Sequence, residues 1–290
     1  MRSIFRISLT VVLFLLCSSR FNAVHAQLAE KTVYYCPMKC EGEKTYDSTG
    51  RCPVCKMKLV PKVIKYNPNE SPDIKGSANN KVKIAGTMMQ TMHSGDASGK
   101  ISLDTIADKN HLYGIGPVEN LTGEITIFDG KSFESTVVSS SRMKVQENYS
   151  VKAPFLVYAN VNKWKEISLP DSVQTISQLE KFLTAAMKQY PQPFAFKVQA
   201  TIRKADVHII NLPKGTIVHS PEEAHKYQKT YHLKNKPVAL IGFFSTKHQG
   251  VFTHHDSYMH IHLITADLKQ MGHVDEFQIE KGTAKLFLAE

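Results

Sequence analysis

The fold of the longer, C-terminal part of this chain is decided by the stretch YMHIHLITAD at residues 258–267, which is followed by GHVD at residues 272–275. The side chains of residues 259–265 alternate in the manner of a β-strand. Because successive side chains of a strand point to opposite faces, His260 and His262 share one face. The stretch therefore predicts a β-hairpin that presents two histidines on one side.

A third histidine, His273, opens the returning strand after a turn-like segment. An antiparallel return can bring it back across from His260 and His262. Three neutral imidazoles leave the double charge of a divalent cation uncompensated and leave coordination positions open, as a Lewis acid requires. A lone histidine is more often structural, but this spacing favours a metal site. His254 and His255, just upstream, are interpreted as loop residues.

Other patterns in this part predict several strands with helices inserted between them. Strands are expected at residues 124–130, where the strand ends in a hairpin turn, at 194–202 and at 238–244. Apolar residues recur at helical spacing over 173–190, and residues 220–223 combine an N-cap serine, a first-turn proline and a capping-box glutamate. These elements indicate an α+β domain.

Four of the five cysteines fall within twenty residues near the other end of the chain, as Cys36-x3-Cys40 and Cys52-x2-Cys55. In an oxidising compartment they could pair into two disulfides. Metal binding is favoured because Cys-Pro-x-Cys places two sulfurs at a tight turn, and two such turns supply four thiolates for a tetrahedral site. Zn²⁺ or Cu⁺ suits that donor set.

Residues 1–26 have the pattern of a signal peptide. Arg2 and Arg6 precede an apolar run over residues 7–17, and small residues precede Gln27, which predicts cleavage before that residue. The run is shorter than the roughly 20 residues that span a bilayer. We therefore expect a periplasmic or secreted protein with no stable membrane insertion after cleavage.

The net charge excludes one class of partner. The formal charge is +10 for the whole chain, and it falls to +7 when the three arginines of residues 1–26 are removed. The remaining excess is spread along the sequence instead of gathering in basic runs with aromatic residues between them, so nucleic-acid binding is not expected. Association into a homodimer is left open by the sequence.

The domain organisation follows from changes in composition. Residues 27–61 form the cysteine module, and residues 106–290 are long enough for one substantial core. Residues 62–105 hold several Pro, Gly, Ser and Asn clusters and are expected to be a linker together with the opening edge of the next domain. A soft cluster of Met88, Met89, Met92 and His93 lies within this segment, and a packed helix face is favoured over copper binding for it.

The cysteine module resembles the heavy-metal-binding domain found at the ends of copper-transporting ATPases and on some periplasmic efflux adaptors. The resemblance rests on YCPM at residues 35–38 and on GRCPVCKMKLVP at residues 50–61. Where that family has His-Pro after the first methionine, this chain has Lys39 and Cys40, which makes the predicted site richer in sulfur.

The C-terminal part resembles the acetolactate decarboxylase family. HLYGIGPVENLTGE at residues 111–124 and Asp129-Gly130 are similar to the opening motif of that family, and the histidine hairpin is similar to its zinc-binding hairpin. The resemblance implies a mixed β-sheet domain. It also implies that His260, His262 and His273 bind Zn²⁺ and that Glu124 reaches the same site as a further ligand and catalytic group.

The chemistry implied by this resemblance is the conversion of 2-acetolactate to acetoin and carbon dioxide, as in acetoin biosynthesis. The hydroxyl and carbonyl oxygens of a 2-hydroxy-3-keto acid can chelate the ion, which then stabilises the charge left by decarboxylation. Glu124, or a polar group beside it, would handle the proton that completes the product. The expected partners are thus a small keto acid and metal ions.

Three positions depart from the family pattern. Lys197 stands where the family has an arginine for the substrate carboxylate, Pro117 replaces a threonine, and Glu290 ends the sequence before a family tail that adds another carboxylate. Lysine carries the charge of arginine without its two-pronged geometry. Arg203 could assist Lys197, although an exposed arginine is the simpler interpretation. These departures leave an alternative function open, a non-catalytic periplasmic copper- or zinc-binding protein that retains the decarboxylase fold.

Overall fold

The computed structural model describes residues 29–38, 45–46, 48–53, 55–66, 82–187 and 190–290. The chain divides into two compact units, Met1–Glu70 and Ser71–Glu290. The predicted signal peptide, residues 1–26, lies outside the described residues, and so does Cys40.

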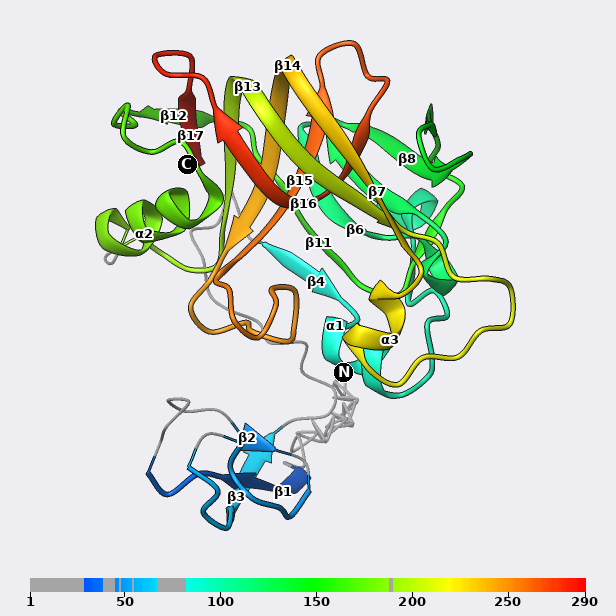
Figure 1. Cartoon of the computed structure of the whole chain (residues 1–290), viewed down its shortest axis with the longest axis vertical. Helices are drawn as coiled ribbons and strands as arrows, with labels where there is room; N and C mark the ends of the chain where they lie inside the picture. Colours follow the sequence, from blue (N-terminus) through cyan, green and yellow to red (C-terminus); the bar gives the residue numbers. More distant parts are fainter. Residues whose placement is uncertain (1–28, 39–44, 47, 54, 67–81, 188–189) are drawn as a thin grey trace, which may run out of the picture. The chain divides into compact units, whose positions relative to one another are not determined.

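The smaller unit is built on one antiparallel sheet in the order β2-β1-β3 (Figure 1). Cys36 directly follows the first strand, and Cys52 and Leu59 complete a small buried core with it. With so few apolar side chains buried, a unit of this size typically needs a metal or a cross-link for stability. The strands are β1 (Ala29–Tyr35), β2 (Thr45–Tyr46) and β3 (Val60–Tyr66).

The larger unit contains two six-stranded sheets, and the first has the order β4-β11-β6-β7-β8-β9. Asp129 and Gly130 form the tight turn between β7 and β8, both with positive φ, which confirms the predicted hairpin. A short pair, β5 (Ile101–Ser102) with β10 (Lys152–Ala153), accompanies this sheet. The six strands are β4 (Lys83–Ala85), β6 (Leu112–Pro117), β7 (Glu124–Phe128), β8 (Lys131–Val137), β9 (Met143–Glu147) and β11 (Leu156–Asn160).

The second sheet has the order β12-β17-β13-β14-β15-β16, and an additional pairing of β13 with β16 closes its last four strands on themselves (Figure 1). This closure is possible because β13 is long enough to pair with β17 through its first half and with β16 through its second half. The strands are β12 (Trp164–Ile167), β13 (Phe194–Ile210), β14 (Gln228–Phe244), β15 (Met259–Thr265), β16 (Met271–Ile279) and β17 (Lys285–Ala289).

The two faces of the second sheet bury different cores. Alternate residues such as Phe196, Leu240 and Ile261 join the largest core, which the closed strands share with the helix that covers them. The opposite face, with Ile241 and Phe243, packs against apolar side chains of β6 and β11 from the first sheet. His260 and His262 lie on this second face, so the sheet-to-sheet interface is where the histidines are buried.

Three α-helices are present in the described residues: α1 (Met88–His93), α2 (Ile176–Ala186) and α3 (Pro221–His225). Helix α2 starts with a reciprocal capping box between Thr175 and Gln178, and it buries Leu179 and Leu183 in the largest core. Helix α1 packs beside α3 (Figure 1). Short 3₁₀ turns occur at Leu103–Thr105 and Glu119–Leu121.

The predicted α+β class is confirmed, with two corrections. Every strand pairing between the named strands is antiparallel, where a mixed sheet was expected. The linker expected over residues 62–105 is also too long, because β3 continues to Tyr66 and β4 pairs with β11 in the larger unit. Met88 and Met92 are buried on α1, so the soft cluster belongs to the folded unit.

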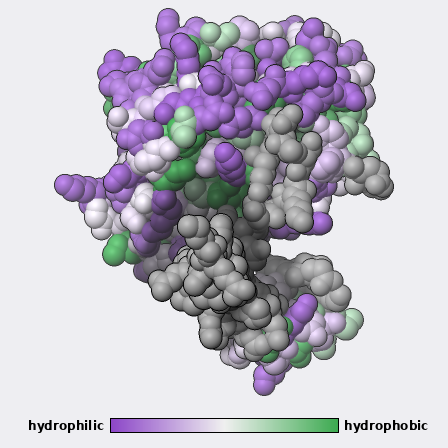
Figure 2. Space-filling view, turned by 180° about the vertical axis from the view of Figure 1, so that it is seen from behind, coloured by the Kyte–Doolittle hydropathy of each residue, from purple (hydrophilic) through white to green (hydrophobic). Residues whose placement is uncertain are grey.

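The exterior of the protein is mainly hydrophilic on the face that Figure 2 shows, with hydrophobic residues scattered over it. Exposed large apolar side chains such as Ile217 and Leu268 are far apart in sequence. Within the described residues, no helix has the length and apolar character that crossing a membrane requires.

The contact between Phe196 and Gly242 gives a test of the closed sheet. These residues are paired across β13 and β14, and a Cβ added to Gly242 would lie 2.1 Å from Cζ of the fully buried Phe196 ring. We predict that Gly242→Ala lowers the free energy of unfolding by about 1–3 kcal/mol, because the ring has no room to move. Denaturant unfolding of Gly242→Ala, Phe196→Leu and the double variant measures the coupling. Strictly additive losses would contradict the predicted contact.

Candidate metal centre

The three predicted histidines come together at the hairpin. His262 on β15 pairs directly with His273 on β16, and His260 precedes His262 by two residues on the same face. The ring centroids of the three are 4.9, 5.0 and 5.5 Å apart. One nitrogen from each ring lies within 4.8 Å of the other two, and Nε2 of His260 is 3.1 Å from Nδ1 of His273. The antiparallel return therefore gathers the donors as the spacing predicted.

The orientation of His262 fits a metal ligand. Its Nδ1 is 3.1 Å from the hydroxyl oxygen of Thr126 on β7, and this contact fixes the orientation of the ring. Its Nε2 is buried without a hydrogen-bond partner among the described residues. A buried ring nitrogen left in this way costs free energy unless something else satisfies it, and a cation does so. The residues present thus fit a divalent ion with open coordination positions.

Glu124 lies beside this set, as the family resemblance implied. It begins β7 and is 3% exposed. One carboxyl oxygen is 3.7 Å from Nε2 of His262, and the other accepts a hydrogen bond from the backbone N–H of Ile210 at 3.3 Å. Burial raises the pKa of Glu124 well above its usual range, with a further contribution from the charge of Asp275. The carboxyl can therefore hold a proton here, or serve as an oxygen ligand.

Burial also controls the protonation of the histidines. It lowers the pKa of His262 to about 3, and it lowers the pKa of His260 and of His273 well below their usual range, with smaller contributions from neighbouring histidines. A metal ion binds only the neutral imidazole, so a depressed pKa reduces competition from protons. These three rings are ready to bind a cation at neutral pH.

The cavity at this site contains three histidines that the sequence did not single out as ligands. His208 on β13, His225 on α3 and His254 line it together with His260 and His273. His254, interpreted from the sequence as a loop residue, faces this cavity, and burial followed by the charge of His225 lowers its pKa to about 4. The sequence signal for His208 was weak because no second histidine lies two residues away. Other lining residues are Met88, Met92, Pro117, Glu124, Phe155 and Ile210.

Lys197 does not line the cavity that contains the histidines, and its contact with substrate stays a prediction. It pairs with Ile241, which in turn pairs with His262, so one strand separates it from the hairpin. Its ammonium group lies 4.8 Å from the ring centroid of Trp164 and 5.1 Å from that of Phe287. Burial lowers the pKa of Lys197, and the aromatic faces hold its charge in place. Arg203 is exposed, as the simpler interpretation had it.

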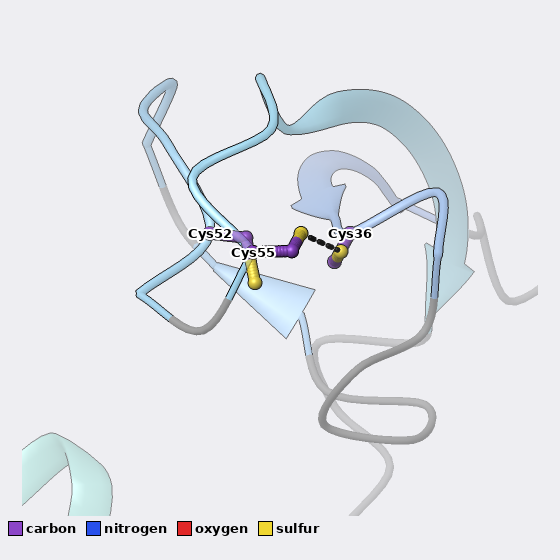
Figure 3. Close-up of side chains that lie close together, drawn as sticks. All are labelled: Cys36, Cys52 and Cys55. Atoms are coloured by element: carbon purple, nitrogen blue, oxygen red, sulfur yellow. Dashed lines mark hydrogen bonds between the residues drawn. The ribbon is translucent and has the colours of Figure 1, made fainter.

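The cysteine module shows the second cluster. The sulfurs of Cys36, Cys52 and Cys55 lie within 4.8 Å of one another, with Cys36 and Cys52 buried (Figure 3). Sγ of Cys36 is 3.5 Å from Sγ of Cys55. That spacing is close to the roughly 3.8 Å edge of a tetrahedron with Zn–S bonds of about 2.3 Å. Three of the four predicted thiolates thus converge, and the fourth, Cys40, lies outside the described residues.

Two family models match the chain in the order expected. The alpha-acetolactate decarboxylase model matches residues 85–289, and the heavy metal binding domain model matches residues 33–62. The chain belongs to the alpha-acetolactate decarboxylase family. No curated protein sequence matches significantly.

Solved structures of this family share the fold of the larger unit. The alpha-acetolactate decarboxylase from Bacillus subtilis strain 168 is 20% identical with a TM-score of 0.58, covering 72% of this chain and 84% of that one. The acetolactate decarboxylase from Bacillus subtilis subspecies spizizenii is 20% identical with a TM-score of 0.59, and the match covers 72% of this chain and 85% of that one. A Staphylococcus aureus protein of unknown function similar to alpha-acetolactate decarboxylase is 17% identical with a TM-score of 0.58, and the match covers 72% of this chain and 84% of that one. Membership in this family and the shared fold support a decarboxylase.

The hydrogen bond between Thr126 and His262 gives a test of the centre. We predict that Thr126→Val, which keeps the shape of the side chain and removes its hydroxyl, raises the dissociation constant for Zn²⁺ about 10- to 100-fold. Competition with a zinc chelator measures that constant. Thr136→Val, on the neighbouring strand β8, is the matched control. Equal affinities in the two variants would show that Thr126 does not orient the ring.

Proposed function

We propose that this protein is an exported, metal-dependent decarboxylase that converts 2-acetolactate to acetoin and carbon dioxide. The observation that carries the proposal is the convergence of the buried His260, His262 and His273, with the carboxyl of Glu124 beside His262, in a chain of this family. Glu124 is the one carboxyl group among the residues that line this cavity.

The three histidines would hold the ion, for which we propose Zn²⁺. Bound there, the ion supplies a Lewis acid that attracts the oxygens of the substrate and stabilises developing negative charge. The protein's own part is to present neutral nitrogens on a rigid hairpin, with Thr126 fixing the ring of His262. Rigid placement of this kind keeps donors aimed without reorganisation during the reaction.

Glu124 is the proposed proton donor. As carbon dioxide leaves, the bond between the carboxylate carbon and its neighbour breaks and the electron pair stays with that neighbour. The atom holding the pair then takes a proton, and Glu124 can deliver one because its buried carboxyl favours the protonated form. The N–H of Ile210 holds the other carboxyl oxygen in position.

The apolar lining supports this chemistry by limiting the access of water. Met88, Met92, Phe155 and Ile210 are at most 7% exposed and surround the polar groups. Excluding water strengthens electrostatic interactions in the cavity and keeps stray protons away from the reacting carbon.

The assay that tests this function follows acetoin formation by zinc-loaded full-length protein supplied with 2-acetolactate. We predict that His262→Ala abolishes turnover, because a ligand is lost. Glu124→Gln should lower kcat by about 10²- to 10⁴-fold, because the acid is removed. Lys197→Met is the matched control: it lies outside the cavity and should change kcat/KM less than tenfold. A large loss in Lys197→Met, or full activity in His262→Ala, would contradict this assignment of roles.

A second candidate function is favoured by the convergence of Cys36, Cys52 and Cys55. Here the protein is a non-catalytic periplasmic binder of copper or zinc that retains the decarboxylase fold. The same assay separates the two functions: no turnover on 2-acetolactate, together with tight Cu⁺ or Zn²⁺ binding that Cys52→Ser removes, supports the second.

Export is part of the proposal and is supported by the pattern of residues 1–26. We predict that protein recovered from the periplasm or the medium begins at Gln27, because signal peptidase would cut after the small residues that precede it. Intact-mass measurement of the recovered protein checks the cleavage site. A mass corresponding to the full chain would contradict removal of a signal peptide.

A further inference from the structure

A groove lined by positive charge lies between two hairpin turns of the larger unit. One turn, residues 138–142, joins β8 to β9, and the other, residues 266–270, joins β15 to β16. This cationic groove has a volume of about 590 Å³, and its charged lining residues are Arg142, Lys144 and Lys269. No carboxylate among the described residues lines it, so it concentrates positive potential that attracts an anion.

The three cations are not neutralised by acidic neighbours. None of them forms an ion pair with a described residue. Asp267 lies in the second turn, but its carboxylate accepts hydrogen bonds from the hydroxyl of Thr265 at 2.6 Å and from the backbone N–H of Lys269 at 3.2 Å. That carboxylate therefore stabilises its own turn, and the cationic side chains stay free for a partner.

Each turn also presents an apolar side chain to solvent at the same groove. Val138 is 46% exposed and Leu268 is 43% exposed, and both line the cationic groove. Leu268 has a φ of 57°, in the left-handed region that suits glycine or asparagine better than leucine. A small soluble anion would gain nothing from these two side chains, so the partner has an apolar part as well as negative charge.

A second groove adjoins the first and is mainly apolar. It has a volume of about 360 Å³, and its lining includes Phe128, Val238 and Ile264. Leu268 lines both grooves, and Lys285 is the one charged residue among those that line the second. Leu268 thus lies where cationic surface meets apolar surface. A combination of this kind is typical of proteins that bind at the interface between lipid headgroups and acyl chains.

Contacts behind the turns hold them in place. The hydroxyl of Tyr231 donates hydrogen bonds to the backbone carbonyls of Ser139 and Arg142, at 3.0 and 3.3 Å. The backbone N–H of Met271 lies 3.2 Å from Sδ of the buried Met143, which links the two hairpins directly. The exposed groups of both turns are therefore presented together without a rearrangement of the fold.

We propose that these two turns dock the larger unit onto the surface of an anionic phospholipid membrane. Arg142, Lys144 and Lys269 contact the lipid phosphates, while Val138 and Leu268 enter the headgroup region. Positive charge supplies the attraction, and the apolar side chains add burial that charge alone does not provide. The contact involves the membrane surface only, and it rests neither on decarboxylase activity nor on bound metal.

Hydrogen exchange on the full-length chain tests this surface directly, because it reports each segment separately. Vesicles of phosphatidylglycerol and phosphatidylcholine in equal parts should slow exchange in residues 138–144 and 266–270, and vesicles of phosphatidylcholine alone should not. Added salt should weaken the protection, since it screens exposed charges. Protection that spares both turns overturns the proposal. So does equal protection by soluble glycerol 3-phosphate, which would identify a site for a free anion.

Charge reversal separates this groove from the net charge of the protein. In the variant with Arg142→Glu, Lys144→Glu and Lys269→Glu, the lipid concentration for half-maximal protection should rise at least about 100-fold, because each basic residue near an anionic membrane contributes roughly a fivefold factor. A control variant with three other exposed lysines reversed has the same net charge and should bind like the unsubstituted chain. Equal losses in the two variants overturn the proposal. The control changes are Lys181→Glu, Lys214→Glu and Lys226→Glu.

The apolar contribution has its own matched pair. Leu268→Asn keeps the turn, because asparagine tolerates positive φ, and it should raise the same lipid concentration about 10-fold through lost burial. Ile217→Asn is the control, because Ile217 is 63% exposed and lines neither groove. Equal behaviour of these two variants contradicts entry of Leu268 into the headgroup region.

Discussion

The closure of β13 onto β16 is the constraint on which the cavity depends. It places His208 directly opposite His273, while the hairpin places His273 opposite His262. Two independent strand pairings therefore fix His273 between two other histidines, on a face that the first sheet covers. Rings held in this way cannot turn to water, so their nitrogens must find partners inside the protein. Nδ1 of His260 and Nε2 of His262 have no hydrogen-bond partner among the described residues, and a cation would satisfy such nitrogens.

The hairpin and the nearby elements could be predicted because each depends on local sequence. Alternation placed His260 and His262 on one face, and the return after a short turn brought back His273. Capping residues located the start of α3 at Ser220, and helical spacing of apolar residues predicted α2, whose cap is Thr175. Such signals involve residues a few positions apart, whose geometry the backbone fixes without help from the rest of the chain.

Contacts between distant segments could not be predicted in the same way. Strand β13 has an irregularity between Ile202 and Lys204, and it changes which residues face the largest core. Before the irregularity, even-numbered residues such as Val198 and Ile202 belong to the largest core. After it, the odd-numbered residues Val207 and Ile209 do. His208 is turned toward the cavity as a result. Simple alternation would have assigned His208 to the opposite face.

The two clusters suit different metal chemistry, and this difference bears on the two candidate functions. Thiolates bind a soft or borderline ion tightly, so Cys36, Cys52 and Cys55 suit retention of an ion. Neutral imidazoles preserve the full charge of an ion and leave positions for oxygen ligands. A protein that only stored metal would gain little from an apolar cavity with a carboxyl of raised pKa beside the ligands. Glu124, buried at a cost in free energy, therefore weighs toward catalysis, because its environment favours the acid form that a decarboxylase needs.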